Sequence, residues 1–465
     1  MGYSYWVDEL YTIQFISGTW TELISKYILP DTHPPLYFIT AKAWTSLFGT
    51  HEASTRTLSS IFSLALIITL WNEWRAKASP RRLILLLLII INPYFLYYSQ
   101  ETRGYSLLLF LASLATLQSI NQLGSNTLSI KANNSKTTHL AIIALSLVHY
   151  FGFIFSASIL LIRSIAHKEW GLRLKELQTL VIISIWPVIH LGIYGGTGHS
   201  QISRIALAGQ SWWQLLQIYS ITNLPFINSG VTFLDIITLL LITFIFAIGI
   251  KTLNTKANLE SNYNQSLNEI FFCITIIGVL IIFIGIINIK SPISTYRNYM
   301  IFIPPSAVIL ANSFEAAFKF AALTKPINII IKLLSLSVIA ITTIISIKIS
   351  HLNLDQKIFF GPDYKDLASY ITDNQICITR CYQASYDPSD ISGKELFGHY
   401  FGKFNLTSLS SFDLNNSSQL NFPIIGMHSS VEKIDDLAEK YQYTNIFILN
   451  STKPSSGGYS FVLTK

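Results

Sequence analysis

The most informative shortage in this sequence is charge. Only 12% of its 465 residues are charged, whereas an ordinary soluble domain carries about 25%. Apolar residues make up 51% of the chain, and apolar runs of roughly 17–25 residues, long enough to cross a ~30 Å hydrocarbon core, recur through the first 350 residues. The composition therefore excludes an ordinary soluble fold and predicts a polytopic, mainly α-helical membrane protein.

The chain also lacks features that define other classes of protein. Its three cysteines form no disulfide framework, and the spacing of Cys377 and Cys381 leaves a bond and two free thiols equally open. The glycines at 195–198 have neither the preceding strand nor the lysine of a phosphate-binding loop, which argues against an energised pump. Met1 is followed by aromatic and acidic residues instead of a signal peptide, so we expect that a first membrane helix is missing from this sequence.

About ten membrane segments are predicted. Residues 139–162 have basic residues on both flanks, so both ends are expected on the cytoplasmic side. We therefore predict two short helices there, folded back at His149–Gly152 with glycine at the bend. The single spans are predicted at 56–72, 82–98, 104–120, 177–194, 232–250, 269–289, 299–318 and 327–349.

Basic residues set the predicted orientation of these segments. The expected inside loops carry fourteen lysines and arginines, so the positive-inside rule places residues 1–55 and the tail, 351–465, outside the cytoplasm. In the first loop, residues 33–49 are expected to form an interfacial helix. Residues 56–350 are the predicted membrane domain. The net positive charge lies in this domain and serves topology, so it gives no reason to expect a nucleic-acid partner.

The tail differs from the rest of the chain in composition. It is polar and carries a net charge of −3. Short β-type runs at 443–449 and 459–463 alternate with helical patterns at 364–371 and 431–440. These patterns predict a small soluble α/β domain at the C-terminus.

Under this topology the unusual polar residues gather at one face of the membrane. Charged groups at membrane depth are costly, so they usually mark a site or pair with one another. Each also has a plainer interpretation: a solvated loop, a helix stop, an interface anchor or a satisfied interior histidine. The residues are Asp8 and Glu9 in YWVDELY, His33 in DTHPPLYF, Glu101, Arg103 and Tyr105 in YYSQETRGY, His149 and Tyr150 at the hairpin tip, and Arg297 and Tyr299 in STYRNYM.

The order and wording of these motifs resemble the GT-C superfamily of membrane glycosyltransferases. The resemblance is to its family 39 branch, which includes protein O-mannosyltransferases and aminoarabinose-transferase-like enzymes. It covers about the first 320 residues, and its strongest parts are YWVDELY, HPPLYF and YYSQETRGY in this order. It implies a GT-C helical bundle that transfers a sugar from a polyprenyl-phosphate donor to a lipid, glycan or protein acceptor. Family members carry a membrane helix before the acidic loop, whereas this chain begins within that loop.

The resemblance also implies roles for the residues. Asp8 would be the general base for the acceptor hydroxyl, which attacks opposite the phosphate and inverts the anomeric centre. Glu9 would hold a sugar hydroxyl or, with Asp8, a divalent cation. Two adjacent carboxylates do not define a hard-cation site, so we predict no metal ligands or certain cofactor and leave metal use open. The donor phosphate would bind His33, Arg103 and Arg297. Substrate would be positioned by Glu101, Tyr105, His149, Tyr150 and Tyr299.

Two other functions compete with this interpretation. A membrane transporter or lipid flippase would also hold charged groups in a cavity, but transporters more often show internal repeats and charges near the midplane. A binding protein that acts through its tail is the third choice. Tyr94–Tyr98 fit a groove for membrane lipid or an aromatic belt equally well. We expect a multi-pass protein of a bacterial cell membrane with its active site on the periplasmic face.

Overall fold

The chain forms two compact units. One contains residues 1–19, 42–56 and 351–465, and the other contains residues 20–41 and 57–350. The division at residues 55 and 350 that composition suggests stays a prediction. The structure, a computed structural model, describes residues 5, 7–30, 33–123, 128–166, 170–193, 211–224, 243, 246–253, 261–290, 294–321, 344, 364–377, 381–384, 398–401, 403–404, 406–408, 422–429, 431–448 and 459–465.

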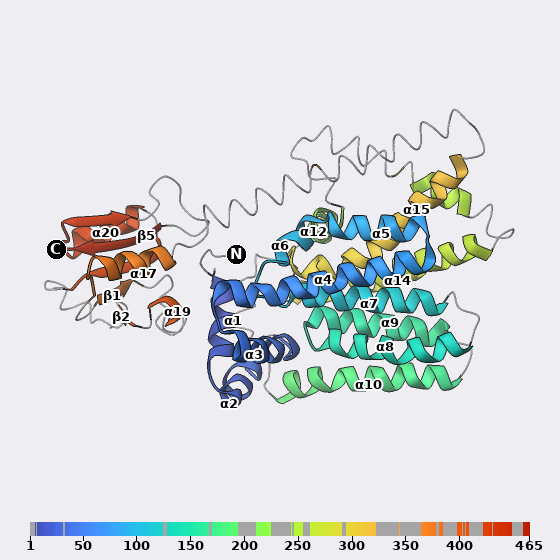
Figure 1. The fold of residues 1–465 in the computed structure, drawn as a ribbon, viewed down its shortest axis with the longest axis horizontal. Coiled ribbons are helices and arrows are strands. Elements are labelled where there is room, and N and C mark those ends of the chain that lie inside the picture. The colour runs from blue at the N-terminus through green and yellow to red at the C-terminus, as the bar shows by residue number, and fades with distance from the viewer. Residues whose placement is uncertain are drawn as a thin grey trace. The chain divides into compact units, whose positions relative to one another are not determined.

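The second unit is a helical bundle in which most of the long helices run roughly along one axis (Figure 1). Two of its helices, α3 and α4, begin or end in the first unit. The elements are α2 (Trp20–Glu22), the π-helical turn η1 (Leu23–Ile28), α3 (Leu36–Phe48), α4 (Glu52–Lys77), α5 (Pro80–Ile90), α6 (Pro93–Tyr98), α7 (Tyr105–Leu123), α8 (Leu128–Ser146), α9 (Tyr150–Ala166), α10 (Trp170–Ile193), α12 (Trp212–Asn223), α14 (Ser261–Lys290), the 3-10 turn η3 (Asn298–Phe302) and α15 (Ile303–Ala321).

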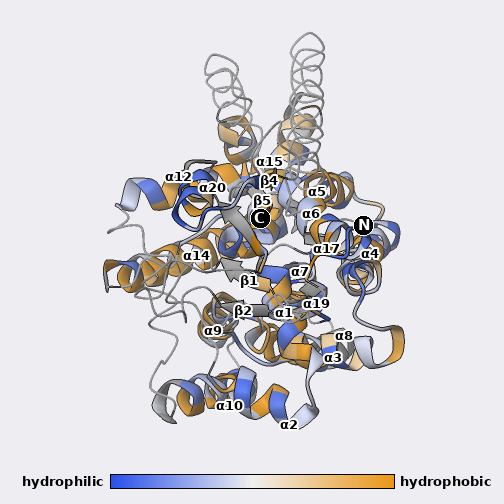
Figure 2. Ribbon diagram, turned by 90° about the vertical axis from the view of Figure 1, so that its left-hand side faces the viewer, coloured by the Kyte–Doolittle hydropathy of each residue, from blue (hydrophilic) through white to orange (hydrophobic). Residues whose placement is uncertain are grey.

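Three helical stretches among the described residues are long and apolar enough to cross a membrane: Glu52–Lys77, Asn264–Ile289 and Asn298–Phe318. They correspond to the predicted spans 56–72, 269–289 and 299–318. Helix α14 is hydrophobic over most of its length (Figure 2), and its Ile289 leaves 73% of its surface exposed, as expected of a lipid-facing residue. The predicted membrane location is thus supported by length and composition.

The other predicted segments have mixed outcomes. Helices α7 and α10 contain nearly all of the predicted spans 104–120 and 177–194. The predicted interfacial segment 33–49 contains helix α3, and its position relative to a membrane stays a prediction. The predicted spans 232–250 and 327–349 lie largely outside the described residues, so the total of ten is not tested.

The prediction of one continuous span at 82–98 is wrong. The chain forms two helices here, because Asn92 ends the first and begins the second. Its side chain accepts hydrogen bonds from the backbone N–H groups of Tyr94 (2.9 Å) and Phe95 (3.4 Å), which is N-cap geometry. Pro93 then occupies the first helical position, where its missing N–H costs nothing. The Asn-Pro pair therefore carried the signal for the break.

The chain folds back within residues 139–162, as predicted, but the two helices are longer than the short ones expected, with 19 and 17 residues, and the turn lies before Tyr150 instead of at His149–Gly152. Helix α8 ends at Ser146, three residues form the turn, and α9 begins at Tyr150. The glycine is needed for a different reason from the one expected. A Cβ atom on Gly152, in the first turn of α9, would lie 2.3 Å from the Leu145 carbonyl oxygen. Gly152 thus permits close approach of the two helices.

Buried ion pairs join neighbouring helices in this unit, in or beside loops that are predicted to face the cytoplasm. Glu269 of α14 accepts hydrogen bonds from Arg82 of α5 (3.2 Å) and Asn312 of α15 (3.1 Å), and lies 3.6 Å from Arg81. Arg163 of α9 binds Glu176 of α10 at 2.6 Å. All these carboxylates are nearly inaccessible to solvent. Basic residues that are predicted to set the topology therefore also hold helices together.

Replacing Glu269 by alanine is expected to lower the free energy of unfolding by about 3–5 kcal/mol, because it leaves Arg82 charged and buried without its carboxylate. Denaturation of the purified protein in detergent would measure this. The control is Glu439→Ala, an exposed position on another helix. Equal free energies of unfolding for the two variants would contradict a stabilising role for the ion pair between Arg82 and Glu269.

The C-terminal part of the first unit contains helices and a sheet, and the separate soluble domain predicted for residues 351–465 stays a prediction. The five-stranded sheet has the order β2-β1-β3-β5-β4, with β1 parallel to β2 and β3, and β5 antiparallel to β3 and β4. Cys377 and Cys381 form a disulfide. The elements are α17 (Tyr364–Asp373), β1 (Cys381–Ala384), α19 (Gly398–Phe401), β2 (Leu406–Ser408), β3 (Ile424–Ser429), α20 (Val431–Lys440), β4 (Asn445–Ile448) and β5 (Tyr459–Thr464).

The core of this sheet follows from amphipathic patterning. Helix α20 buries Ile434 and Ala438, four residues apart, against strands β3 and β5. The strands contribute alternate residues, including Phe461 and Leu463 of β5. The N-terminal part of the same unit contains α1 (Val7–Ser17).

Candidate active site

The HPPLYF motif leads directly into helix α3. Prolines at 34 and 35 donate no backbone hydrogen bond, so the first backbone N–H after His33 is that of Leu36. It donates to the carbonyl oxygen of Leu147 in the α8–α9 turn at 2.9 Å. This bond ties the segment carrying His33 to the turn carrying His149, although the two lie far apart in the sequence.

The second motif forms the loop between α6 and α7. Hydroxyl groups of α4 hold its backbone: Ser59 donates to the Glu101 carbonyl oxygen at 2.6 Å, and Ser60 donates to that of Ser99 at 2.9 Å. Ser106 closes the loop by donating to the carbonyl oxygen of Tyr98 at 2.7 Å. Serines on an apolar helix thus fix the loop that presents Arg103.

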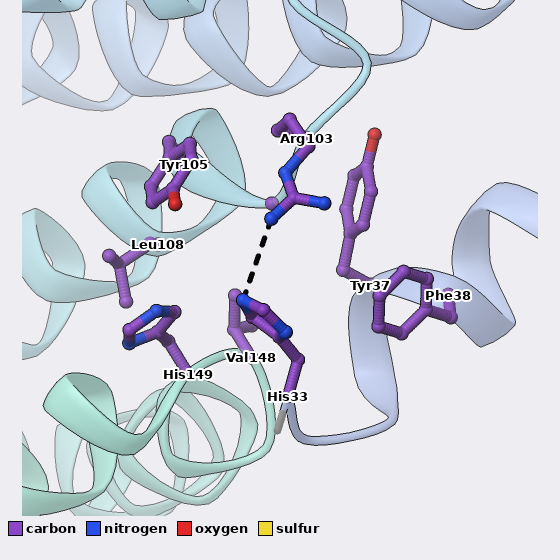
Figure 3. Close-up of a pocket in the computed structure, with 9 residues that line it drawn as sticks. His33, Tyr37, Phe38, Arg103, Tyr105, Leu108, Val148 and His149 are labelled. Carbon is purple, nitrogen blue, oxygen red and sulfur yellow. Dashed lines mark hydrogen bonds between the residues drawn. The ribbon is translucent and has the colours of Figure 1, made fainter. Parts of the chain in front are cut away.

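These segments meet in one pocket of the second unit (Figure 3). Arg103 Nη2 lies 3.5 Å from His33 Nε2, and the rings of His33 and His149 are 5.6 Å apart. Because a guanidinium only donates, His33 Nε2 accepts in this contact, which is long for a hydrogen bond. The lining residues are His33, Tyr37, Phe38, Arg103, Gly104, Tyr105, Leu108, Val148 and His149.

Gly104 allows this pocket to close. A Cβ atom at this position would lie 3.2 Å from Cβ and Cγ of Tyr37, and 3.4 Å from Val148. Tyr37 is 3% exposed, so its ring has little room to retreat. A glycine between Arg103 and Tyr105 is therefore needed for the loop to pack on α3.

Glu101 and Arg297 belong to the surroundings of this pocket. Both lie within electrostatic range of the Tyr98 hydroxyl, and the Tyr98 ring packs against Tyr105 with centroids 4.8 Å apart. Glu101 is fully buried, whereas Arg297 is half-buried just before η3. A second charged residue of the Arg103 motif and one from the STYRNYM motif thus lie near the pocket.

Tyr150 and Tyr299 contact other groups. The Tyr150 hydroxyl bonds Nδ1 of His190 on α10, while Nε2 of His190 lies 3.0 Å from the carbonyl oxygen of Leu29. Because a carbonyl only accepts, Nε2 carries a proton in this contact. Tyr299 is buried and donates to Ser294 at 3.3 Å. Neither tyrosine lines the pocket, so their expected role in positioning substrate stays a prediction.

The acidic pair lies on α1, in the first unit. Asp8 is half-buried in the first turn of this helix, and Glu9 is fully buried. Both oxygens of Glu9 accept from Arg56 of α4, at 3.0 Å from Nε and 2.7 Å from Nη2, and Arg56 is also fully buried. The Arg56 guanidinium lies 5.2 Å from the centre of the Tyr5 ring. The two carboxylates therefore occupy different environments.

Breaking the ion pair between Arg56 and Glu9 is expected to destabilise the protein. Arg56→Met leaves the buried Glu9 carboxylate uncompensated, which should cost about 3–5 kcal/mol in free energy of unfolding. The double variant Arg56→Met, Glu9→Met removes both charges and should recover most of the loss. Thermal unfolding in detergent would measure both. A double variant as unstable as the single one would contradict the assignment.

Several residues of these sites were missed from the sequence. Arg56 was detectable as a charged residue at the start of an apolar run, and His190 as a histidine inside another. Ser59 and Ser60 carried no signal, because serine is common in membrane helices. Among the described residues, no group of three His, Cys, Asp or Glu side chains is arranged to hold a metal ion.

Fold and pocket together define a helical membrane protein with a basic, histidine-containing pocket. No family model matches the chain, and no curated protein matches its sequence. Solved structures do. The chain is similar to ArnT from Cupriavidus metallidurans in the apo state, with 12% identity and a TM-score of 0.51 over 99% of this chain and 94% of that one.

A second structure of the same protein, bound to undecaprenyl phosphate, has 12% identity and a TM-score of 0.53, over 98% of this chain and 92% of that one. At this identity the likeness concerns the fold. It shows an ArnT-like fold, because the likeness extends over nearly the whole of both chains, and membership of the GT-C superfamily stays a prediction. Membership of family 39 stays a prediction.

Proposed function

We propose that the protein is a membrane glycosyltransferase that transfers a sugar from a polyprenyl-phosphate donor to an acceptor hydroxyl. The observation that carries this proposal is the pocket formed by Arg103, His33 and His149 within an ArnT-like fold. Cationic and hydrogen-bond-donating groups of this kind suit a phosphate. The ArnT structure that contains undecaprenyl phosphate supports the same donor class.

The donor side of the reaction is assigned to the second unit. As the bond between sugar and phosphate breaks, negative charge grows on the phosphate oxygens. Arg103 can meet it with a planar pair of N–H groups, and His33 can add one donor. The 3.5 Å contact between the two residues is weak, so little is lost when a phosphate oxygen replaces it. Arg297 is proposed to add long-range positive charge, and Glu101 to orient it.

The acceptor side is assigned to α1. Asp8 is the proposed general base, because it is half-buried, whereas both oxygens of Glu9 are held by Arg56. The base removes the proton of the acceptor hydroxyl as its oxygen attacks the anomeric carbon. The bond to phosphate breaks on the opposite side, so one displacement inverts the anomeric centre. Glu9 then serves chiefly to hold the helix that carries Asp8.

The proposed face of the reaction is extracytoplasmic. The Cys377–Cys381 disulfide supports an oxidising compartment for the tail, since such bonds persist mainly outside the cytoplasm. The buried ion pairs of Arg82 and Arg163 lie at helix ends predicted to face the cytoplasm. In a bacterium this orientation places the reaction in the periplasm.

The test is turnover. Purified protein is incubated in detergent with a panel of polyprenyl-phosphate sugars and candidate acceptors, and the release of polyprenyl phosphate is measured. Release that depends on acceptor supports the proposal. Tight binding of polyprenyl phosphate without turnover of any donor would instead favour a lipid flippase.

A further inference from the structure

The C-terminal part of the chain contributes a residue to the surroundings of the acidic helix. Tyr400, on the short helix α19, packs near α1 within the first unit. Its hydroxyl oxygen accepts the backbone N–H of Tyr5 at 2.7 Å and donates to Oε1 of Glu52 at 2.7 Å. The hydroxyl of Tyr400 therefore joins the segment of Tyr5 to the start of α4 at Glu52. Tyr400 itself lies about 350 residues after Glu52 in the sequence.

The two groups that bond to the Tyr400 hydroxyl, the Tyr5 N–H and the Glu52 carboxylate, are buried and require hydrogen-bond partners within the protein. Tyr5 is fully buried, and a buried backbone N–H without a partner is costly. Glu52 is 7% exposed, so its carboxylate also depends on internal donors. The hydroxyl of Tyr5 is itself engaged, at 2.8 Å from the Thr50 carbonyl oxygen and 2.6 Å from Thr55 Oγ1. The contact is thus part of a closed polar network.

This network includes residues of the first turn of α4. Glu52 and Thr55 lie in that turn, and Arg56 follows four residues after Glu52 on the same face. Arg56 in turn holds both oxygens of Glu9, which adjoins Asp8. The path from Tyr400 to the acidic pair therefore runs through one helical turn and one ion pair.

The protonation state of Tyr400 suits a donor. Burial raises the pKa of its phenol well above the ordinary value. The N–H of Tyr5 lowers this pKa by less than burial raises it, and the hydrogen bond to Glu52 raises it again. Burial likewise raises the pKa of Tyr5. Both phenols stay protonated at physiological pH, so Tyr400 can donate to Glu52.

We propose that Tyr400 is a positioning residue of the acidic site: it fixes Tyr5 and Glu52, and through the turn carrying Arg56 it sets the placement of α1 and Asp8. The role in catalysis rests on the transferase function proposed above. The tail would then be needed for the chemical step in addition to any part in binding an acceptor.

The direct test is Tyr400→Phe, which keeps the ring and removes the hydroxyl. We expect kcat for polyprenyl-phosphate release to fall about 10-fold, the scale of one hydrogen bond to a charged group, with the KM for donor unchanged. The matched control is Tyr370→Phe, in the same tail, whose ring stacks on Phe447 at 3.8 Å. Equal losses in the two variants, or a change in donor KM alone, would overturn the proposal.

A second readout does not depend on turnover. Hydrogen–deuterium exchange of the peptide covering α1 should quicken about 10-fold in Tyr400→Phe, whereas that covering β5 should not change. Unchanged exchange in α1 overturns the placement of Tyr400, whatever the activity. If the wild-type protein turns over no donor, the transferase proposal fails, and faster exchange in α1 still supports Tyr400 as the residue that positions this helix.

Discussion

Asp8→Asn should lower kcat by at least about 100-fold, the scale expected when a general base is removed. The substitution keeps the size of the side chain and removes its basicity. Donor KM should stay within a few-fold of wild type, because the donor phosphate is assigned to residues of the other unit. The measurement is steady-state release of polyprenyl phosphate at saturating acceptor.

The control for this experiment is Asp366→Asn. Asp366 also lies in the first turn of a helix, but it is exposed on α17. Its kcat and its KM for donor should equal those of wild type. Full activity of Asp8→Asn would rule out Asp8 as the base, and Glu9 would not replace it easily, because its oxygens are held by Arg56.

Arg103→Gln should lower kcat/KM by about 100- to 1,000-fold, since removing one preorganised donor from a developing anion typically costs that much. The kcat/KM of Arg103→Lys should lie between those of Arg103→Gln and wild type, because lysine keeps the charge but loses the planar pair of N–H groups. Affinity for polyprenyl phosphate, measured by equilibrium binding, should weaken in the same order.

Arg75→Gln is the matched control, because Arg75 is exposed near the end of α4. Its kinetics and its affinity for polyprenyl phosphate should not change. If Arg103→Gln kept wild-type affinity and turnover, the pocket around His33 would have to serve something other than the donor phosphate.

Local patterns predicted the local structure well. The apolar runs gave α4, α7, α14 and α15, and the polar tail gave helices α17 and α20 and strands β4 and β5. The hairpin at His149 followed from basic residues on both flanks. The error at 82–98 came from counting apolar residues and passing over Asn92-Pro93, whose capping chemistry outweighs hydrophobicity.

The motifs predicted part of the candidate site. His33, Arg103, Tyr105 and His149 do meet in one pocket, and Glu101 and Arg297 lie near Tyr98, which packs against Tyr105. Tyr150 turned out to bind His190, and Glu9 to bind Arg56. A sequence shows which residues carry charge, but a partner on another helix depends on how the helices pack.

The sequence by itself determined that this is a helical membrane protein, where most of its described helices run, and which polar residues stand out from an apolar background. These follow from periodicity and transfer free energy, which act over neighbouring residues. Only the tertiary structure showed that Arg56 holds both oxygens of Glu9, and only it brought Tyr400 to Tyr5 and Glu52. Two adjacent carboxylates are chemically equivalent in the sequence, and they become different when one is buried against an arginine 47 residues away.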